Sequence, residues 1–279
     1  MMKNSPLLLG AAVALLVGCE PTRSTTETTS ASSAAATSRP SAMRAGSMTK
    51  NGLTLTPLTT SPKMPEAQMQ LLSPLASSTL PSGEVAFDYE ITNFQLTKMS
   101  GGMEKGQMAN SMKGQHIHNI VDNAPYTAHY TTKFSKPLAD GPHAVLSFLS
   151  RSYHESLKHR GAYDLRIINV GDVKAGTEPP INVRGANLFY SRPKDTYAGA
   201  DAKRILLDFY LVNTILEPGG NNVRATINGT EFMLEKWQPY QMEGLPVGEN
   251  TVKLELVDSS GAAVPGAYNS VTRTFTVTP

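Results

Sequence analysis

Apolar and polar side chains alternate along several short segments of this chain. Residues 85–92 carry an apolar side chain at every second position, and residues 251–256 repeat this pattern. A period of two puts successive side chains on opposite faces of a strand, so both segments predict strands with one buried face. The pairs Asp122-Asn123 and Asn228-Gly229 are typical of tight hairpin turns. No segment shows a sustained helical period.

The chain contains two copies of one unit. Residues 85–96 match residues 205–216, and residues 120–126 and 138–143 match residues 226–232 and 245–250 in the same order. Repeats of this length, rich in short strands, predict an all-β fold with two tandem immunoglobulin-like antiparallel β-sandwich domains. We expect the first domain at residues 66–170, a linker at 171–186 and the second domain at 187–279.

The N-terminus has the features of a secretory signal. Residues 1–18 carry Lys3, then an apolar stretch, then a small residue before Cys19, the only cysteine. The segment Leu16-Val17-Gly18-Cys19 resembles the lipobox of bacterial lipoproteins, in which the cysteine is acylated. This resemblance implies a lipid anchor at Cys19 and a place in the cell envelope. Glu20 favours the outer membrane, with the periplasmic or surface side left open.

Residues 19–65 differ in composition from the rest of the chain. Ser and Thr dominate between Thr22 and Ser41, and few side chains there can be buried. Such a segment cannot offset its chain entropy by burial. We therefore expect residues 19–65 to form a disordered tether.

The net charge and the missing catalytic motifs exclude several classes of function. The net charge of +2 gives no electrostatic case for nucleic acid as a partner. The segment His154-Glu155-Ser-Leu-Lys-His159 misses the zinc-protease spacing by one residue, and the sequence has no nucleophile elbow or phosphate loop. The sequence therefore favours a protein that is not an enzyme.

All six histidines lie in the first copy, between His116 and His159, and the second copy has none. His116 and His118 are two residues apart on an expected strand, so their side chains leave the same face, which we expect to be exposed. A methionine-bearing insertion precedes them. Imidazole suits copper and zinc, and thioether sulfur suits Cu(I). The pattern predicts a copper or zinc site, or else surface histidines with local hydrogen bonds. The candidate ligands are His116, His118, His129, Met108 and Met112.

Two further features separate the copies. Arg151, His154 and Arg192 stand beside hydroxyl and aromatic residues, where arginine can pair with a phosphate or carboxylate or can stack on a tyrosine. Ala144, Leu146 and Phe148 form an apolar outer face where the second copy is polar. An apolar face of this kind is normally covered. The second domain, the methionine-bearing insertion or a partner could cover it, and of these we expect the second domain.

Three segments carry a wider resemblance, namely residues 114–126, 149–156 and 207–213. Through them the chain resembles a family of bacterial lipoproteins often labelled phosphopeptide-binding proteins. That label implies forkhead-associated recognition, but the Ser-x-x-His element of that pattern is absent here. The sequence as a whole favours a non-enzymatic binding or structural lipoprotein, with a protein or peptide as a possible partner. The alternatives are a periplasmic copper or zinc binder and a module for phosphopeptides or other anionic ligands.

Overall fold

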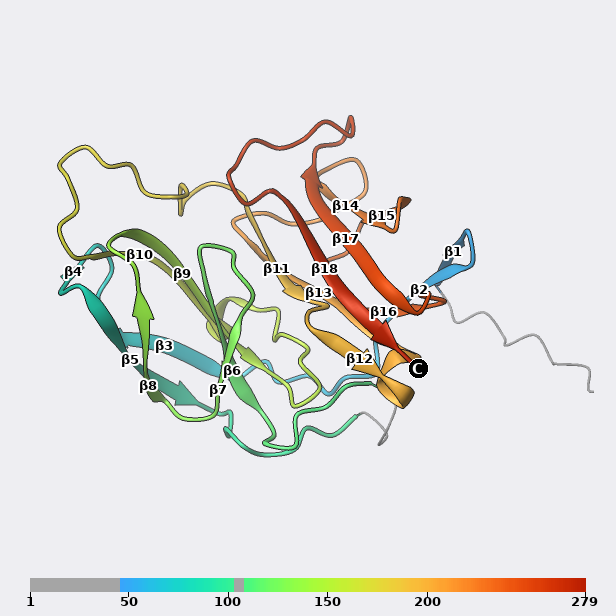
Figure 1. Ribbon diagram of the computed structural model, residues 1–279, viewed down its shortest axis with the longest axis horizontal. Coiled ribbons are helices and arrows are strands. Elements are labelled where there is room, and N and C mark those ends of the chain that lie inside the picture. The colour runs from blue at the N-terminus through green and yellow to red at the C-terminus, as the bar shows by residue number, and fades with distance from the viewer. Residues whose placement is uncertain (1–45, 103–107) are drawn as a thin grey trace, which may run out of the picture. The chain divides into compact units, whose positions relative to one another are not determined.

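The fold is built from two β-sandwiches. The computed structural model describes residues 46–102 and 108–279, and these residues lie in one compact unit (Figure 1). Cys19 and the signal segment lie outside the described residues. The described part contains only strands, loops and two short 3-10 helices, at Arg160–Ala162 and Gly199–Ala202. The expected all-β class with tandem immunoglobulin-like sandwiches is confirmed.

The first sandwich packs a three-stranded sheet, β3-β5-β8, against a five-stranded sheet, β4-β10-β9-β6-β7. Its core draws Phe87 and Leu71 from the smaller sheet, and Val145 and Ile168 from the larger one. The strands are β3 (Gln68–Ser73), β4 (Thr79–Leu80), β5 (Gly83–Thr92), β6 (His116–Val121), β7 (Thr127–His129), β8 (Lys133–Leu138), β9 (Gly141–Ser150) and β10 (Tyr163–Val170).

The second sandwich repeats this topology strand for strand. Its sheet β12-β18-β17-β14-β15 corresponds to the larger sheet of the first sandwich, and β11-β13-β16 corresponds to the smaller one. The hairpin turns at Asp122 and Asn228 both have positive φ, at 51° and 45°, which aspartate and asparagine tolerate better than most residues. The strands are β11 (Asn187–Arg192), β12 (Thr196–Ala198), β13 (Ile205–Val212), β14 (Asn222–Ile227), β15 (Thr230–Leu234), β16 (Tyr240–Glu243), β17 (Gly248–Val257) and β18 (Ser270–Thr278).

The second sandwich also includes a segment from the N-terminal part of the chain. Strands β1 (Met48–Lys50) and β2 (Leu53–Pro57) form a hairpin, and β2 pairs antiparallel with β16. Leu53 and Leu55 lie in the core of the second sandwich. The expectation of a disordered tether over residues 19–65 is therefore wrong for residues 48–57, because these alternating leucines bury themselves against a distant part of the chain.

The outer faces of the two sandwiches pack on each other. Ala144, Leu146 and Phe148 of β9 share a buried cluster with Phe189 and Tyr210 of the second sandwich. The rings of Phe148 and Tyr210 are stacked, with centroids 4.7 Å apart. The expectation that the second domain covers this apolar face is confirmed.

This contact explains why β6, β9 and β13 are buried almost throughout. On β6, Ile117 and Val121 point into the core of the first sandwich, whereas Ile120 belongs to the cluster between the sandwiches. His116 and His118 alternate with Ile117, so they lie on the face toward the second sandwich. Each has an exposed fraction of 0%. The expected exposed histidine pair is therefore a buried pair, because the second sandwich covers that face.

Candidate functional site

Three imidazole rings converge where the first sandwich meets the second. His116 and His118 come from β6, and His154 comes from the turn after β9. Nε2 of His116 lies 2.9 Å from Nε2 of His118 and 3.1 Å from Nδ1 of His154. One ring nitrogen from each residue lies within 4.8 Å of the other two. This spacing could hold a metal ion.

The pairing of β6 with β9 brings His154 to this place. His116 is opposite Ser150 in that pair, so the turn that follows Ser150 lies beside the start of β6. The turn is closed by hydrogen bonds from the amide of His154 to the carbonyl of Arg151, at 3.0 Å, and from the amide of Arg151 to the carbonyl of Glu155, at 2.9 Å. His154 has a φ of +67°, a left-handed conformation that histidine adopts more readily than most residues.

Hydrogen bonds around the cluster orient the rings. Nδ1 of His116 lies 2.8 Å from the carbonyl oxygen of Gly114. A carbonyl only accepts, so Nδ1 carries the proton and Nε2 presents its lone pair to the other two rings. Nδ1 of His118 lies 3.5 Å from the hydroxyl of Ser191, which can donate or accept. Partners of this kind hold metal-binding histidines in place.

Nδ1 of His154 lies close to both a tyrosine hydroxyl and the ring of His116. The hydroxyl of Tyr126 is 3.3 Å from this nitrogen, and Nε2 of His116 is 3.1 Å from it. With the proton on Nδ1, His154 donates to Nε2 of His116, and with the proton on Nε2 it presents the lone pair of Nδ1 to the same point. The second tautomer is the one in which Nδ1 can bind a metal ion.

Burial keeps the three rings neutral. Loss of hydration lowers the pKa of His116 to about 4, against a weaker opposing effect of the Gly114 carbonyl. It also holds the pKa values of His118 and His154 well below their usual range, with further lowering by the charge of Arg192. Neutral imidazole is the form that binds metals, so the cluster is in its ligand form at neutral pH.

The spacing of the nitrogens can be compared with that of ligands around a transition metal. Imidazole nitrogens bind zinc at about 2.0–2.1 Å, which puts two ligands of a tetrahedral ion ~3.3 Å apart. The observed separations of 2.9 and 3.1 Å are slightly shorter than this. The third pair of nitrogens, from His118 and His154, is bounded only by the 4.8 Å that spans the cluster, so these two rings would have to move toward each other before all three bind one tetrahedral ion.

The other expected metal ligands lie elsewhere. His129 is opposite Ile117 in the β6–β7 pair, and its ring stacks on Phe134 with centroids 3.3 Å apart. Met108 is buried in a cluster with Leu58, Tyr153 and Leu206. Met112 is 88% exposed. The structure thus brings together His116 and His118 from the expected set and adds His154, which the sequence had grouped with the arginines.

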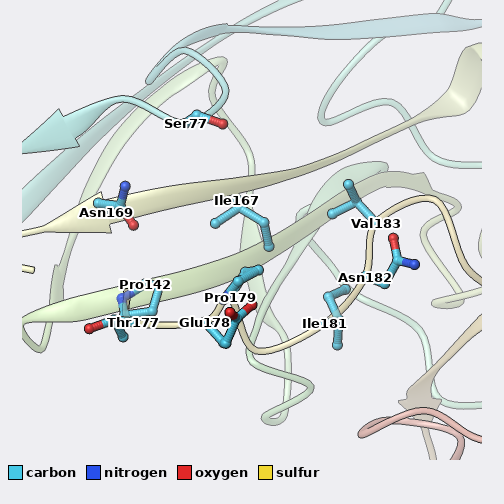
Figure 2. A pocket seen from close by; sticks show the side chains of 10 residues that line it. All are labelled: Ser77, Pro142, Ile167, Asn169, Thr177, Glu178, Pro179, Ile181, Asn182 and Val183. Carbon is cyan, nitrogen blue, oxygen red and sulfur yellow. The ribbon is translucent and has the colours of Figure 1, made fainter. Parts of the chain in front are cut away.

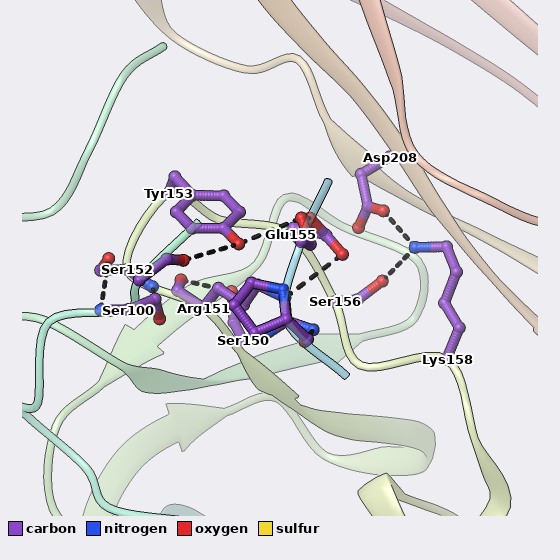
Figure 3. A network of polar contacts seen from close by, with 12 residues as sticks. Ser100, Ser150, Arg151, Ser152, Tyr153, Glu155, Ser156, Lys158 and Asp208 are labelled. Carbon is purple, nitrogen blue, oxygen red and sulfur yellow. Dashed lines mark hydrogen bonds and ion pairs between the residues drawn. The ribbon is translucent and has the colours of Figure 1, made fainter. Parts of the chain in front are cut away.

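The expected anion-binding residues do not form one site. Arg151 donates through Nε to Glu155 at 3.3 Å and through Nη2 to the carbonyl of Pro62, as part of a buried polar network (Figure 3). Lys158 in the same network pairs with Asp208 of β13 and lies 2.6 Å from the hydroxyl of Ser156. Arg151 and Lys158 line a cavity of about 340 Å³. Each of these cations already has a carboxylate partner, which lowers the attraction for an external anion.

Arg192 lies near the histidine cluster instead. Its guanidinium carbon is 5.4 Å from the ring centroid of Tyr126, and the Tyr126 ring stacks on His118 with centroids 3.5 Å apart. Arg192 and His154 are therefore brought into one neighbourhood, whereas Arg151 faces away into the network with Glu155.

A cavity of about 560 Å³ lies between the linker and the first sandwich (Figure 2). Pro142 of β9 and Ile167 of β10 form one side, and Pro179 and Ile181 of the linker form the other. Glu178 is the one titratable residue in its lining. Among the described residues, the potential metal ligands therefore come together in the histidine cluster and not in this cavity.

No helix in the described residues is long and apolar enough to span a membrane. No protein-family model matches the chain, and no curated protein matches it.

Several solved structures are similar in fold. The fibronectin(III)-like modules of Clostridium thermocellum CbhA share 10% identity over 75% of this chain and 94% of theirs, with a TM-score of 0.26. SGBP-B of the Bacteroides ovatus mixed-linkage glucan utilization locus, solved with a mixed-linkage heptasaccharide, shares 11% identity over 76% of this chain and 70% of its own, with a TM-score of 0.23. The central fibronectin-III array of RIM-binding protein shares 12% identity over 80% of this chain and 69% of its own, with a TM-score of 0.23. These likenesses concern the β-sandwich fold alone.

Proposed function

We propose that this protein is a non-enzymatic metal-binding module of the bacterial cell envelope, with copper or zinc held by His116, His118 and His154. The observation that carries the proposal is the convergence of three neutral imidazole nitrogens, two from buried rings and one from a half-buried ring, within 4.8 Å of one another.

The comparison of the two copies supports a specific role for the first one. Residues equivalent to His116 and His118 in the second copy are Asn222 and Arg224, at the start of β14. The second sandwich therefore keeps the scaffold without the ligands. Its part in the proposed function is to cover the cluster and exclude water from it.

The location in the envelope rests on the sequence of the N-terminus. Acylation of Cys19 would attach the module to the membrane, and the segment between Cys19 and β1 would separate the two. Metabolic labelling with palmitate tests this part. We expect label in the wild-type protein and none in Cys19→Ser, and label that persists in the variant would exclude the anchor.

Metal binding is tested on the chain from residue 19 onward with Cys19→Ser, so that β1 and β2 are retained. Thermal melts of the metal-free protein with added Cu(I) or Zn(II) should show a saturable increase in Tm. A ligand at 100 times its Kd stabilises the folded state by about 2.7 kcal/mol. The increase should be lost in His154→Ala and retained in His129→Ala, a matched histidine outside the cluster.

The metal-free Tm of His154→Ala serves as a check on folding. His154 is the least buried of the three ligands, so its truncation disturbs the packing least. An absence of any shift with either metal in the wild-type protein would refute the proposed function. An equal loss of the shift in His129→Ala would refute the assignment of the ligands.

A further inference from the structure

The second sandwich places two cations beside the histidine cluster. Arg192 ends β11, and Lys194 follows it in the next turn. Nζ of Lys194 lies 4.6 Å from the ring centroid of Tyr126, the ring that also contacts Arg192 and stacks on His118. The first sandwich therefore supplies the imidazoles, and the second supplies positive charge next to them.

Arg192 is the more important of the two cations. Its exposed fraction is 8%, its Nη1 donates to the hydroxyl of Tyr197 at 2.8 Å, and its Nε has no hydrogen-bond partner. Within residues 46–102 and 108–279, no carboxylate pairs with it. Lys194, in contrast, pairs with the exposed Asp195 at 2.9 Å, which screens its charge. Arg192 thus puts an unscreened positive charge close to the cluster.

The ligands supply no negative charge to balance a metal ion. The cluster consists of three imidazoles, and no aspartate, glutamate or cysteine from the part of the chain that the structure describes belongs to it. Repulsion by Arg192 grows in proportion to the charge of the bound ion, so it acts on Zn(II) and Cu(II) twice as strongly as on Cu(I). Zinc also favours a fourth ligand, which is usually water or a charged side chain. Cu(I) has one charge and accepts three nitrogen ligands.

We propose that the site selects Cu(I) over divalent ions and that Arg192 of the second sandwich sets this preference. The inference rests on the proposed function, because it needs metal bound by the three histidines. In this inference the second copy does more than cover the cluster. Its Arg192 determines which oxidation state of copper the first copy binds.

The size of the effect follows from Coulomb's law. A unit charge ~10 Å away at an effective dielectric constant of about 20 changes an ion's affinity by roughly tenfold per unit of ionic charge. Removal of the Arg192 charge should therefore raise the affinity for Cu(I) about tenfold and that for Zn(II) about 100-fold. The ratio of the two affinities shifts by about tenfold toward zinc.

The test measures Kd for Cu(I) and Zn(II) by competition with chromophoric chelators in wild type, Arg192→Gln and Arg192→Lys. Arg192→Lys keeps the charge and should keep the ratio, whereas Arg192→Gln should shift it. Tyr197→Phe removes the hydrogen bond to Arg192 without removing charge, and should also keep the ratio. Lys194→Gln, on a partly exposed side chain, should shift the ratio in the same direction by less.

The outcomes separate the two proposals. If the wild-type protein binds neither ion, the proposed function fails and the inference fails with it. If both ions bind and Arg192→Gln leaves their ratio unchanged, the inference alone is overturned. Should Arg192→Gln unfold, the wild-type protein decides the question, and a tighter Kd for Zn(II) than for Cu(I) there overturns the inference as well.

Discussion

Leu55 offers a direct test of whether the segment before residue 58 belongs to the fold. Its side chain has an exposed fraction of 0% and lies in the core of the second sandwich. In β2 it is opposite Met48 on one side and Met242 on the other. A residue in a disordered tether could be truncated at no cost, so Leu55→Ala distinguishes the two possibilities.

The expected loss is large. Leu→Ala at a fully buried site removes the transfer free energy of the side chain and leaves a cavity, which together cost about 2–5 kcal/mol. In a unit of this size each kcal/mol lowers Tm by about 2–4 °C, so a decrease of roughly 4–20 °C follows. Leu72→Ala, at a leucine that is 43% exposed, is the matched control and should change stability by less than about 0.5 kcal/mol.

The assay is urea unfolding followed by the fluorescence of Trp237, the only tryptophan. Trp237 packs on both the core of the second sandwich and the cluster between the sandwiches, so it reports on the part of the fold that β2 supports. A midpoint for Leu55→Ala within error of that for Leu72→Ala would refute the assignment of β2 to the core.

Three further predictions concern the buried groups. Burial lowers the pKa of His116 to about 4 from an unfolded value near 6.5, so the contribution of neutral His116 to folding stability is present above pH 6.5 and is lost as pH falls toward 4. In urea unfolding of the metal-free protein, this residue should make the free energy of unfolding about 2 kcal/mol smaller at pH 5 than at pH 7. A urea midpoint that does not change over this pH range would contradict the reasoning. Phe148→Ala should lower the free energy of unfolding by about 3–5 kcal/mol, because it empties the stacked contact with Tyr210; a calorimetric melt unchanged from wild type would exclude that contact. Lys158→Met should lower the free energy of unfolding by about 3–5 kcal/mol, because it leaves Asp208 buried without its partner. In urea unfolding, the double variant Lys158→Met/Asp208→Asn should recover most of that loss. A double variant as unstable as the single one would show that the broken ion pair is not the cause.

Local patterns in the sequence were sufficient to predict much of the β-sandwich architecture. The period-two alternation of residues 85–92 corresponds to β5, and the turn pairs at Asp122 and Asn228 both close hairpins with positive φ. The order of matched segments predicted the repeated topology. These features depend on neighbours along the chain, which is why a single sequence contains them.

Part of the candidate site was also visible in this way. His116 and His118 share a face because they are two residues apart on one strand, and the absence of histidines from the second copy pointed to the first. The prediction of His129 as a metal ligand was wrong. Its side chain lies on the opposite face of the sheet from His116, beside Phe134.

The remaining features depend on contacts between residues far apart in the sequence, and only the tertiary structure decided them. The register between β6 and β9 brought His154 to His116, and the packing of the second sandwich buried His116 and placed Arg192 nearby. Leu55 pairs with Met242 of β16, nearly two hundred residues away in the sequence. A sequence pattern specifies which face of a strand is apolar. Which distant surface covers that face, and which charges come with it, is determined by the packing free energy of the whole fold.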